Sequence, residues 1–109
     1  MSSGPGRFKE PTLLVLLSLI DGPRHGYAIA DDIDRLTGTR PGPGTLYGAI
    51  DRLLAAALIA EAPKSGRRQP YELTATGREV VEHELAVLSS VVRHGRRRLH
   101  DPASATGQA

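Results

Sequence analysis

The sequence predicts a mainly α-helical protein with one small β-hairpin. Apolar residues recur at helical spacing in three stretches between residues 11 and 57. The pattern then changes to two short strand-like segments, and a heptad-like spacing follows from residue 75 to residue 100. A chain of 109 residues with 39% hydrophobic and 24% charged residues suits one small domain. We expect residues 1–10 and 101–109 to be a disordered arm and a disordered tail.

The first helix is expected to begin at Pro11, because proline is favoured in a first helical turn. Leu13, Leu14, Leu16, Leu17 and Ile20 would bury nearly every side of it. The apolar run is too short to span a bilayer, so we expect a buried helix and no membrane partner. Asp21-Gly22-Pro23 would end it as a turn.

The second helix is predicted from HGYAIADDIDRLTG, residues 25–38. Tyr27, Ala30, Ile33 and Leu36 or Thr37 recur at helical spacing, which predicts the apolar face. Aspartates and an arginine fill the other face. Gly38 is placed as a C-terminal stop.

The third helix is predicted from PGPGTLYGAIDRLLAAALI, residues 41–59. Pro43 suits the first helical position, and Gly42 is a tolerable N-cap. The apolar stripe consists of Leu46, Ile50, Leu53, Leu54 and Ala57. Near its start the opposite face carries small residues, so this rigidly placed helix end permits close approach by a large partner.

A hairpin follows, with strands expected at residues 58–62 and 70–74. The connecting loop PKSGRRQ contains Gly66 and carries Lys64, Arg67 and Arg68. Three cations at a hairpin tip suit phosphate contact, and the alternative is a solvated tip that protects an edge strand.

The last helix, residues 75–100, is expected to make a homodimer. Thr74 or Thr76 can cap it, and Thr76 with Glu79 matches a capping box. An apolar seam steps by 4, 3, 4, 3 and 4 residues through Val81, Leu85, Leu88, Val92, Gly95 and Leu99. We expect Val81, Leu85, Leu88 and Val92 to pair with Leu13, Leu16 and Leu17 of the partner's first helix. The seam can also pack on the same chain's core, and we expect both uses.

The order helix, helix, helix, strand, basic loop, strand is that of a winged helix-turn-helix, here residues 11–74. A recognition helix enters the DNA major groove with its N-terminal residues near the bases, and its free N–H groups favour phosphate. The predicted DNA-binding residues are therefore Gly44, Thr45, Tyr47, Gly48, Arg52, Lys64, Arg67 and Arg68. For Tyr47 the alternative is a ring packed on the second helix.

Charge is unevenly distributed along the chain. The net charge of +2 is the sum of −1 for residues 1–63 and +3 for residues 64–109. Basic residues cluster at 64–68 and 93–98, and a local basic patch suits a polyanionic partner. Arg96, Arg97 and Arg98 also complement the dipole of the last helix at its C-terminus, so their role stays open.

Three stretches in order, LLSLIDGPRHGYAI, PGTLYGAIDRLLAAALI and GRRQPYELTATGRE, make the chain similar to the PadR family of transcriptional regulators. The resemblance covers roughly residues 11–90. It implies a homodimeric winged-helix DNA-binding protein, usually a repressor of a palindromic operator that a small molecule releases. The single last helix resembles the short subfamily, in which that helix makes the dimer. It also implies a capping or packing role for His25.

Two departures from that family stand out. Gly42 occupies a position where the family usually has Ser, which removes a side-chain cap at a cost of a few tenths of a kcal/mol. The chain has no Trp, whereas multidrug-sensing relatives stack planar ligands on one. A small hydrophobic effector is still a candidate partner, in a cavity beside Leu85, Leu88 and Val92 with Leu13, Leu16 and Leu17.

Other classes of function find little support in the sequence. There is no cysteine, no metal-ligand spacing and no recognisable catalytic motif, so we expect no metal, no cofactor and no enzymatic activity. The absence of cysteine and of a signal-peptide pattern suits a cytoplasmic protein. A winged helix used for protein interaction, without an operator, is the alternative function. An RNA-binding module is weaker, because stacking aromatics are lacking on the strands.

Overall fold

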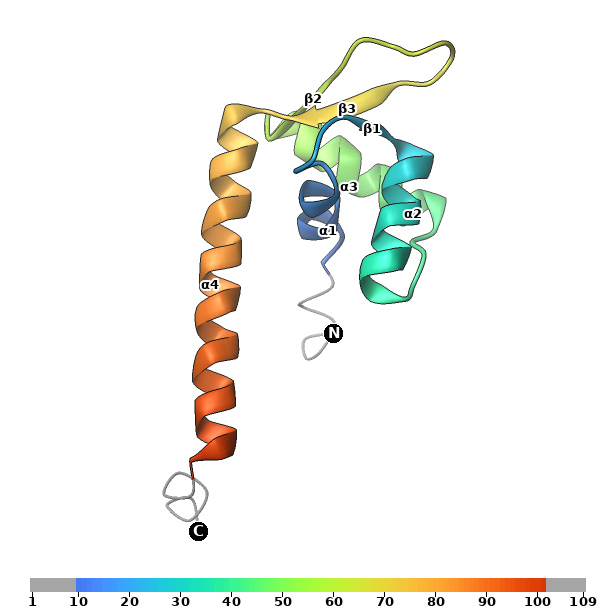
Figure 1. Cartoon of the computed structure of the whole chain (residues 1–109). Helices are drawn as coiled ribbons and strands as arrows, with labels where there is room; N and C mark the ends of the chain where they lie inside the picture. Colours follow the sequence, from blue (N-terminus) through green and yellow to red (C-terminus); the bar gives the residue numbers. More distant parts are fainter. Residues whose placement is uncertain (1–9, 102–109) are drawn as a thin grey trace.

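The computed structural model describes residues 10–101, and it confirms the predicted mainly helical fold with a small antiparallel sheet (Figure 1). The elements are α1 (Pro11–Ser18), β1 (Arg24–His25), α2 (Gly26–Thr37), α3 (Pro43–Ala55), β2 (Ile59–Glu61), β3 (Pro70–Leu73) and α4 (Ala75–His100). Apart from Glu10 and Asp101, the arm and the tail expected to be disordered lie outside the described residues.

The sheet has three strands in the order β1-β3-β2, all antiparallel. Arg24 pairs with Tyr71, and Ile59 pairs with Leu73. No sequence pattern predicts β1, because two residues are too few to show an alternation. β2 and β3 are each shorter than predicted. The wing loop, defined here as residues 62–69, connects them at one end of the molecule (Figure 1).

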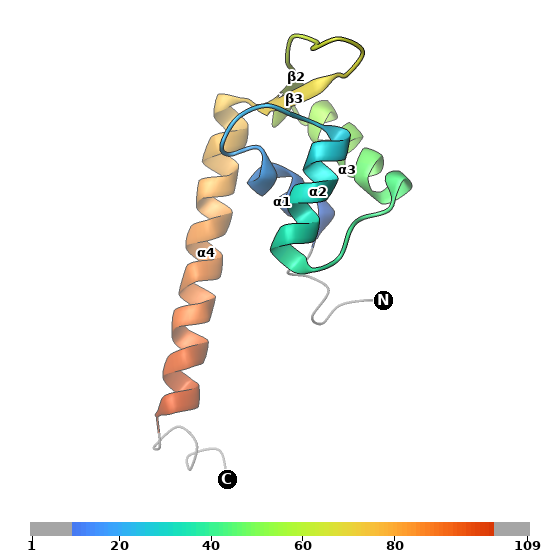
Figure 2. The same cartoon turned by 45° about the vertical axis from the view of Figure 1, so that its right-hand side comes forward.

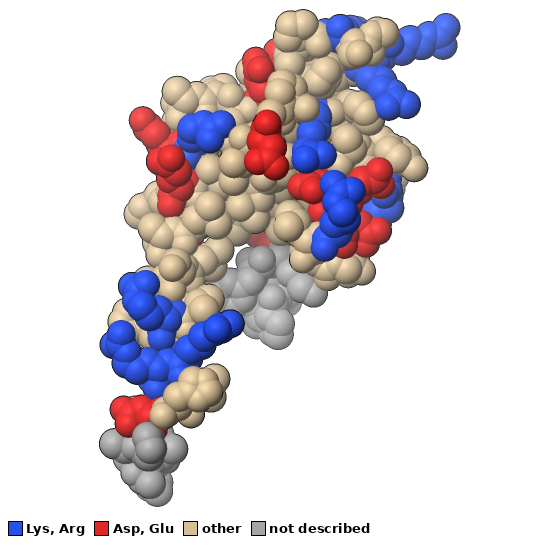
Figure 3. All heavy atoms as spheres, viewed as in Figure 1, with Lys and Arg blue, Asp and Glu red and all other residues tan. Residues whose placement is uncertain are grey.

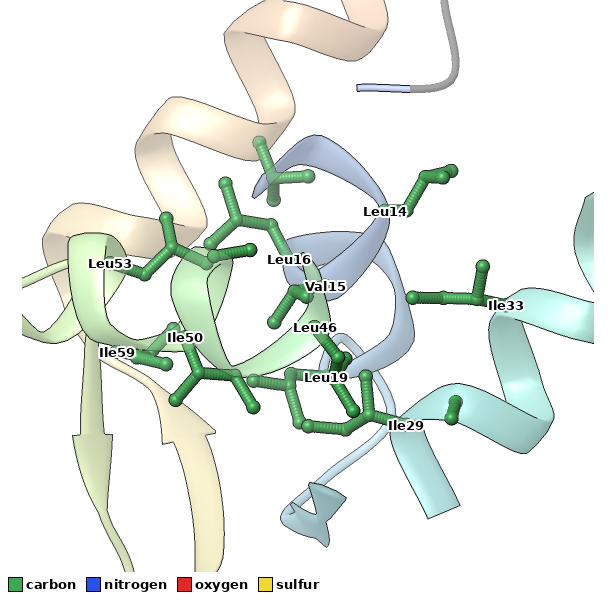
Figure 4. Packing of buried hydrophobic residues seen from close by; sticks show 13 residues of the cluster. Leu14, Val15, Leu16, Leu19, Ile29, Ile33, Leu46, Ile50, Leu53 and Ile59 are labelled. Atoms are coloured by element: carbon green, nitrogen blue, oxygen red, sulfur yellow. The ribbon is translucent and has the colours of Figure 1, made fainter. Parts of the chain in front are cut away.

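The hydrophobic core surrounds α1, which packs against α2, α3 and the start of α4 (Figure 4). Val15, Leu19, Ile29, Ile50 and Ile59 are at most 1% exposed. Burial of each such side chain contributes about 1.5–3 kcal/mol. Ser18 is buried as well, and its hydroxyl donates to the Val15 carbonyl oxygen at 2.9 Å.

The buried face of α2 differs from the predicted one. Ala30 and Ile33 are buried as predicted, but Tyr27 and Leu36 are 66% and 56% exposed, and Gly26 and Ile29 face the core in their place. Both sets satisfy helical spacing, so the period alone does not choose between them. Packing against α1 and α3 places the two isoleucines inside.

The end of α3 is the second difference. Ala57 lies outside the helix, is exposed and has a left-handed φ of 60°. The Leu58 N–H donates to Leu53 O and the Ala57 N–H donates to Leu54 O, each at 3.0 Å. This is a Schellman motif with alanine in the position that glycine usually takes. It turns the chain from α3 into β2, so Ala57 cannot extend the apolar stripe.

Thr74, and not Thr76, caps α4. Its hydroxyl oxygen accepts from the Gly77 N–H at 3.0 Å, and its O–H donates to Ala57 O at 2.8 Å. Only the first turns of α4 touch the core, and the rest of the helix extends away from it (Figure 2). The molecule is accordingly elongated, with extents of 60 × 27 × 24 Å.

Candidate nucleic-acid interface

The N-terminus of α3 is open to solvent. Gly42 is the N-cap and makes no side-chain hydrogen bond, and Pro43 begins the helix as predicted. Within residues 10–101, the backbone N–H groups of Gly44 and Thr45 have no acceptor. Both residues are exposed. Two unpaired donors at the positive end of a 13-residue helix can bind an anion such as phosphate.

Tyr47 both packs against α2 and exposes part of its side chain to solvent. A Cβ atom added to Gly26 would lie 2.1 Å from the Tyr47 hydroxyl oxygen, so that end of the ring rests on the first residue of α2. The side chain is nevertheless 45% exposed. Gly26 is therefore required for this close approach, and Tyr47 keeps one face available to a partner.

The remaining predicted residues of α3 lie along its solvent side. Gly48 is partly exposed, and the Arg52 guanidinium runs back beside it, 3.6 Å from the position a Cβ would take. Asp51 is exposed on the same helix. The surface near the start of α3 thus consists of backbone, a hydroxyl and a phenol, with an arginine one turn further on.

The wing loop presents its cations at a tight turn. Ser65 and Arg68 exchange two backbone hydrogen bonds at 3.2 Å, and Gly66 has a φ of 65°, as the first position of a type II′ turn requires. The Gln69 side-chain amide donates to Ala62 O and Pro70 O, which holds the base of the loop. Lys64, Arg67 and Arg68 are exposed, and Figure 3 shows this basic tip at the upper right.

His25 connects the wing loop to α2. Its Nδ1 accepts from the Ala28 N–H at 3.4 Å and caps the helix, and its Nε2 lies 2.9 Å from Nη1 of Arg68. Both contacts need an acceptor nitrogen, and a neutral imidazole has only one. The cap and the Arg68 contact therefore compete. No sequence pattern indicates the Arg68 contact, because 43 residues separate the two side chains.

A groove of about 430 Å³ lies between the wing loop, the start of α2 and Tyr47 of α3. It is lined by His25, Gly26, Tyr27, Tyr47, Arg67, Arg68, Gln69 and Tyr71. Partial burial raises the pKa of the Tyr71 hydroxyl, and the charges of neighbouring groups raise it further. The phenol is protonated at neutral pH, as an ordinary tyrosine also is, and can donate a hydrogen bond.

Arg40, in the turn before α3, was not among the predicted site residues. Its guanidinium lies 4.6 Å from the centre of the Tyr27 ring and forms an ion pair with Asp31. The hydrogen bond with Asp31 raises the pKa of Arg40 further above its already high value. Arg40 therefore adds a permanent cation beside the α3 N-terminus, and the exposed Tyr27 ring lies against it. Its place directly before Pro41 was the only signal in the sequence.

The predicted dimer residues fall into two groups. Leu16 and Val81 are 3% and 1% exposed and pack within the chain's own core. Leu13, Leu17 and Leu88 are partly buried, whereas Leu85 and Val92 are 39% and 51% exposed. A cavity of about 240 Å³ between α1 and α4 includes Leu13 and Leu16 in its lining, together with Glu10 and Glu84. Leu85, Leu88 and Val92, expected beside an effector, do not line it.

Residues 14–83 match the model of the transcriptional regulator PadR-like family. The chain belongs to the PadR-like family. A PadR-like regulator of Bacillus cereus has a similar structure, with a TM-score of 0.76 at 18% identity over 87% of this chain and 96% of that one. A PadR family regulator of Clostridium difficile gives 0.72 at 22% identity, over 82% and 97%. These likenesses show the shared fold.

A Streptomyces fradiae protein of 37.1 kDa, encoded in transposon Tn4556 and uncharacterized, is 46% identical over 89 residues. These are 79% of this PadR-like chain but only 26% of that protein. PadR-like proteins are transcriptional regulators and not enzymes. Within residues 10–101, no three His, Asp or Glu side chains converge as metal ligands. No helix in this part of the chain has the length and apolar character needed to cross a membrane.

Proposed function

We propose that this PadR-like chain binds a palindromic DNA operator as a homodimer and represses transcription until a small hydrophobic effector releases it. The observation that carries the proposal is the uncovered N-terminus of α3 beside the basic wing loop. The groove that they border is lined by both elements, so one DNA segment can contact the two together. The small residues at the start of α3 let its backbone approach the base edges.

The DNA contacts follow from this arrangement. Thr45 and Tyr47 read base edges, and the N–H groups of Gly44 and Thr45 hold a phosphate. Lys64, Arg67 and Arg68 neutralise flanking phosphates, with Arg68 leaving His25 to do so. Gly48 permits close approach, and Arg52 extends the contact along the backbone of the DNA.

The dimer follows from α4. Among the described residues, Leu85, Val87, Val91 and Val92 expose large apolar side chains on a helix that leaves the core. Its first half carries Glu79, Glu82 and Glu84, and its second half carries arginines (Figure 3). In an antiparallel pair of α4 helices centred between Leu88 and Ser89, Leu85 of one copy lies level with Val92 of the other and Glu84 lies level with Arg93, so the acidic first half of each helix runs beside the basic second half of the other. A second copy of the chain therefore matches this helix in both its apolar surface and its charge.

A two-fold dimer of this kind presents two α3 helices to DNA. Half-sites are then expected roughly 34 Å apart, and the operator is palindromic because the dimer is symmetric. The repressor role, release by an effector, the short-subfamily assignment and a cytoplasmic location are supported by the resemblance to the family and by the sequence composition.

The test is salt-dependent binding to the DNA upstream of the gene, measured by fluorescence anisotropy. Removing two phosphate contacts in an Arg67→Ala/Arg68→Ala variant should reduce the slope of log K against log salt by about 1.8. Arg35→Ala is the control, because Arg35 lies in the last turn of α2, at the end opposite to His25, and pairs with Asp32. This variant should leave the slope unchanged. Salt-independent binding, or equal slopes for all three proteins, contradicts the proposal and favours the protein-interaction alternative.

A further inference from the structure

An apolar cavity of about 320 Å³ lies directly behind the DNA-facing end of α3. Its walls come from the first half of α1, the end of α2 and the turn that leads into α3, and they include Leu14, Val15, Ile33, Pro41 and Thr45. Leu14 and Ile33 extend into the space between α1 and α2 (Figure 4). The cavity belongs neither to the groove beside the wing loop nor to α4.

The lining defines the chemistry of an occupant. Every lining residue is uncharged, and the walls are mainly aliphatic. The volume falls within the range of about 300–1,000 Å³ that small-molecule pockets occupy. Within residues 10–101, the hydroxyls of Thr39 and Thr45, which both line the cavity, make no hydrogen bond. The Thr37 hydroxyl already bonds the backbone of Ile33 and Thr39.

We propose that this cavity binds a small uncharged molecule, largely apolar and carrying one hydroxyl or carbonyl group, and that it is the effector site. The inference rests on the proposed function, since it names the site through which an effector acts. The ring or alkyl body of the ligand lies against Leu14, Val15 and Ile33, and its polar group bonds the Thr39 hydroxyl. The cavity between α1 and α4 is smaller and includes two carboxylates in its lining, so it suits such a ligand less well.

The position of the cavity supplies the regulation. Thr45 contributes to the cavity from the first turn of α3 and to the DNA surface from the same turn. A ligand between α1, the α2–α3 turn and Thr45 therefore favours one orientation of the α3 N-terminus. It weakens operator binding to the extent that it binds this orientation better than the DNA-bound one. By linkage, the operator weakens ligand binding by the same factor.

The test uses the full chain without DNA and 4-propylphenol as the probe, with backbone amide shifts followed by NMR. Saturable shifts are expected at Ile33, Thr39 and Thr45. The charged analogue 4-hydroxybenzoate should cause none. Leu14→Phe, which fills the cavity, and Thr39→Leu, at an exposed position that should tolerate the change, should each weaken probe binding at least tenfold.

Three results with the probe would overturn the inference. They are the absence of saturable shifts up to millimolar probe, shifts confined to residues around Leu85 and Leu88, and unchanged affinity in a folded Thr39→Leu protein. Nuclear Overhauser contacts between Phe8 and Leu14 in the free protein would also overturn it, because residues 1–9 would then occupy the cavity. Operator binding is measured separately, so failure of the probe and failure of DNA binding are distinguishable.

Discussion

Replacing Gly77 with alanine should destabilise the protein, although alanine is the better helix former. Gly77 lies in the first turn of α4, where that helix joins the sheet. A Cβ atom there would be 1.9 Å from the Leu58 carbonyl oxygen, which is backbone and cannot rotate away. Ordinary van der Waals contact begins at 3.4 Å, so the two groups would have to separate by about 1.5 Å.

The cost can be worked from the contacts around this junction. Leu58 O accepts from the Thr74 N–H at 3.1 Å, and Thr74 Oγ1 donates to Ala57 O at 2.8 Å. Overpacking costs about 1–3 kcal/mol, and each strained hydrogen bond about 1 kcal/mol. The gain in helix propensity is at most about 1 kcal/mol. The net loss is about 2–4 kcal/mol, which corresponds to a fall in Tm of roughly 8–32 °C.

The assay is thermal unfolding followed by circular dichroism, at one protein concentration because dimerisation adds to the apparent stability. Gly48→Ala is the matched control. The Cβ it adds would lie 3.6 Å from the flexible end of Arg52, so this variant should gain up to about 1 kcal/mol. A Gly77→Ala protein as stable as the parent would refute the reasoning, because it would mean that α4 does not approach Leu58 as the structure has it.

Three further perturbations probe other parts of the molecule. Ala57→Gly should stabilise the chain by about 1 kcal/mol in urea unfolding, because glycine adopts the left-handed conformation without penalty, and no gain would contradict a Schellman end for α3. His25→Ala should lower the free energy of unfolding by about 1 kcal/mol. His25→Asn should lower it little, because asparagine can cap α2 although it is too short to hold Arg68, and equal losses would argue against the capping role. Glu84→Arg and Arg93→Glu should each weaken dimerisation in sedimentation equilibrium at low salt, and the double variant should restore it, unless α4 pairs in another register.

Much of this fold follows from rules that act within a few residues of the chain. Pro11 and Pro43 begin helices because proline suits a first turn, and Gly38 ends one because it accepts a left-handed φ, here 80°. The hairpin with its basic tip follows from the change of period and from Gly66. The order of these elements was enough to predict a winged helix-turn-helix, and the structure and the family membership confirm it.

The assignment of faces and partners required the tertiary structure. A helical period defines a stripe only to within about one position, so packing against α1 decided that Ile29 and not Tyr27 is buried. Likewise, Val81 and Leu85 share one predicted seam. Val81 is a core residue and Leu85 is exposed, because the contact between α1 and α4 ends between them. β1, the His25–Arg68 contact and the cavity behind α3 join residues far apart in the chain. No local pattern encodes such contacts, because they depend on where the whole core places each element.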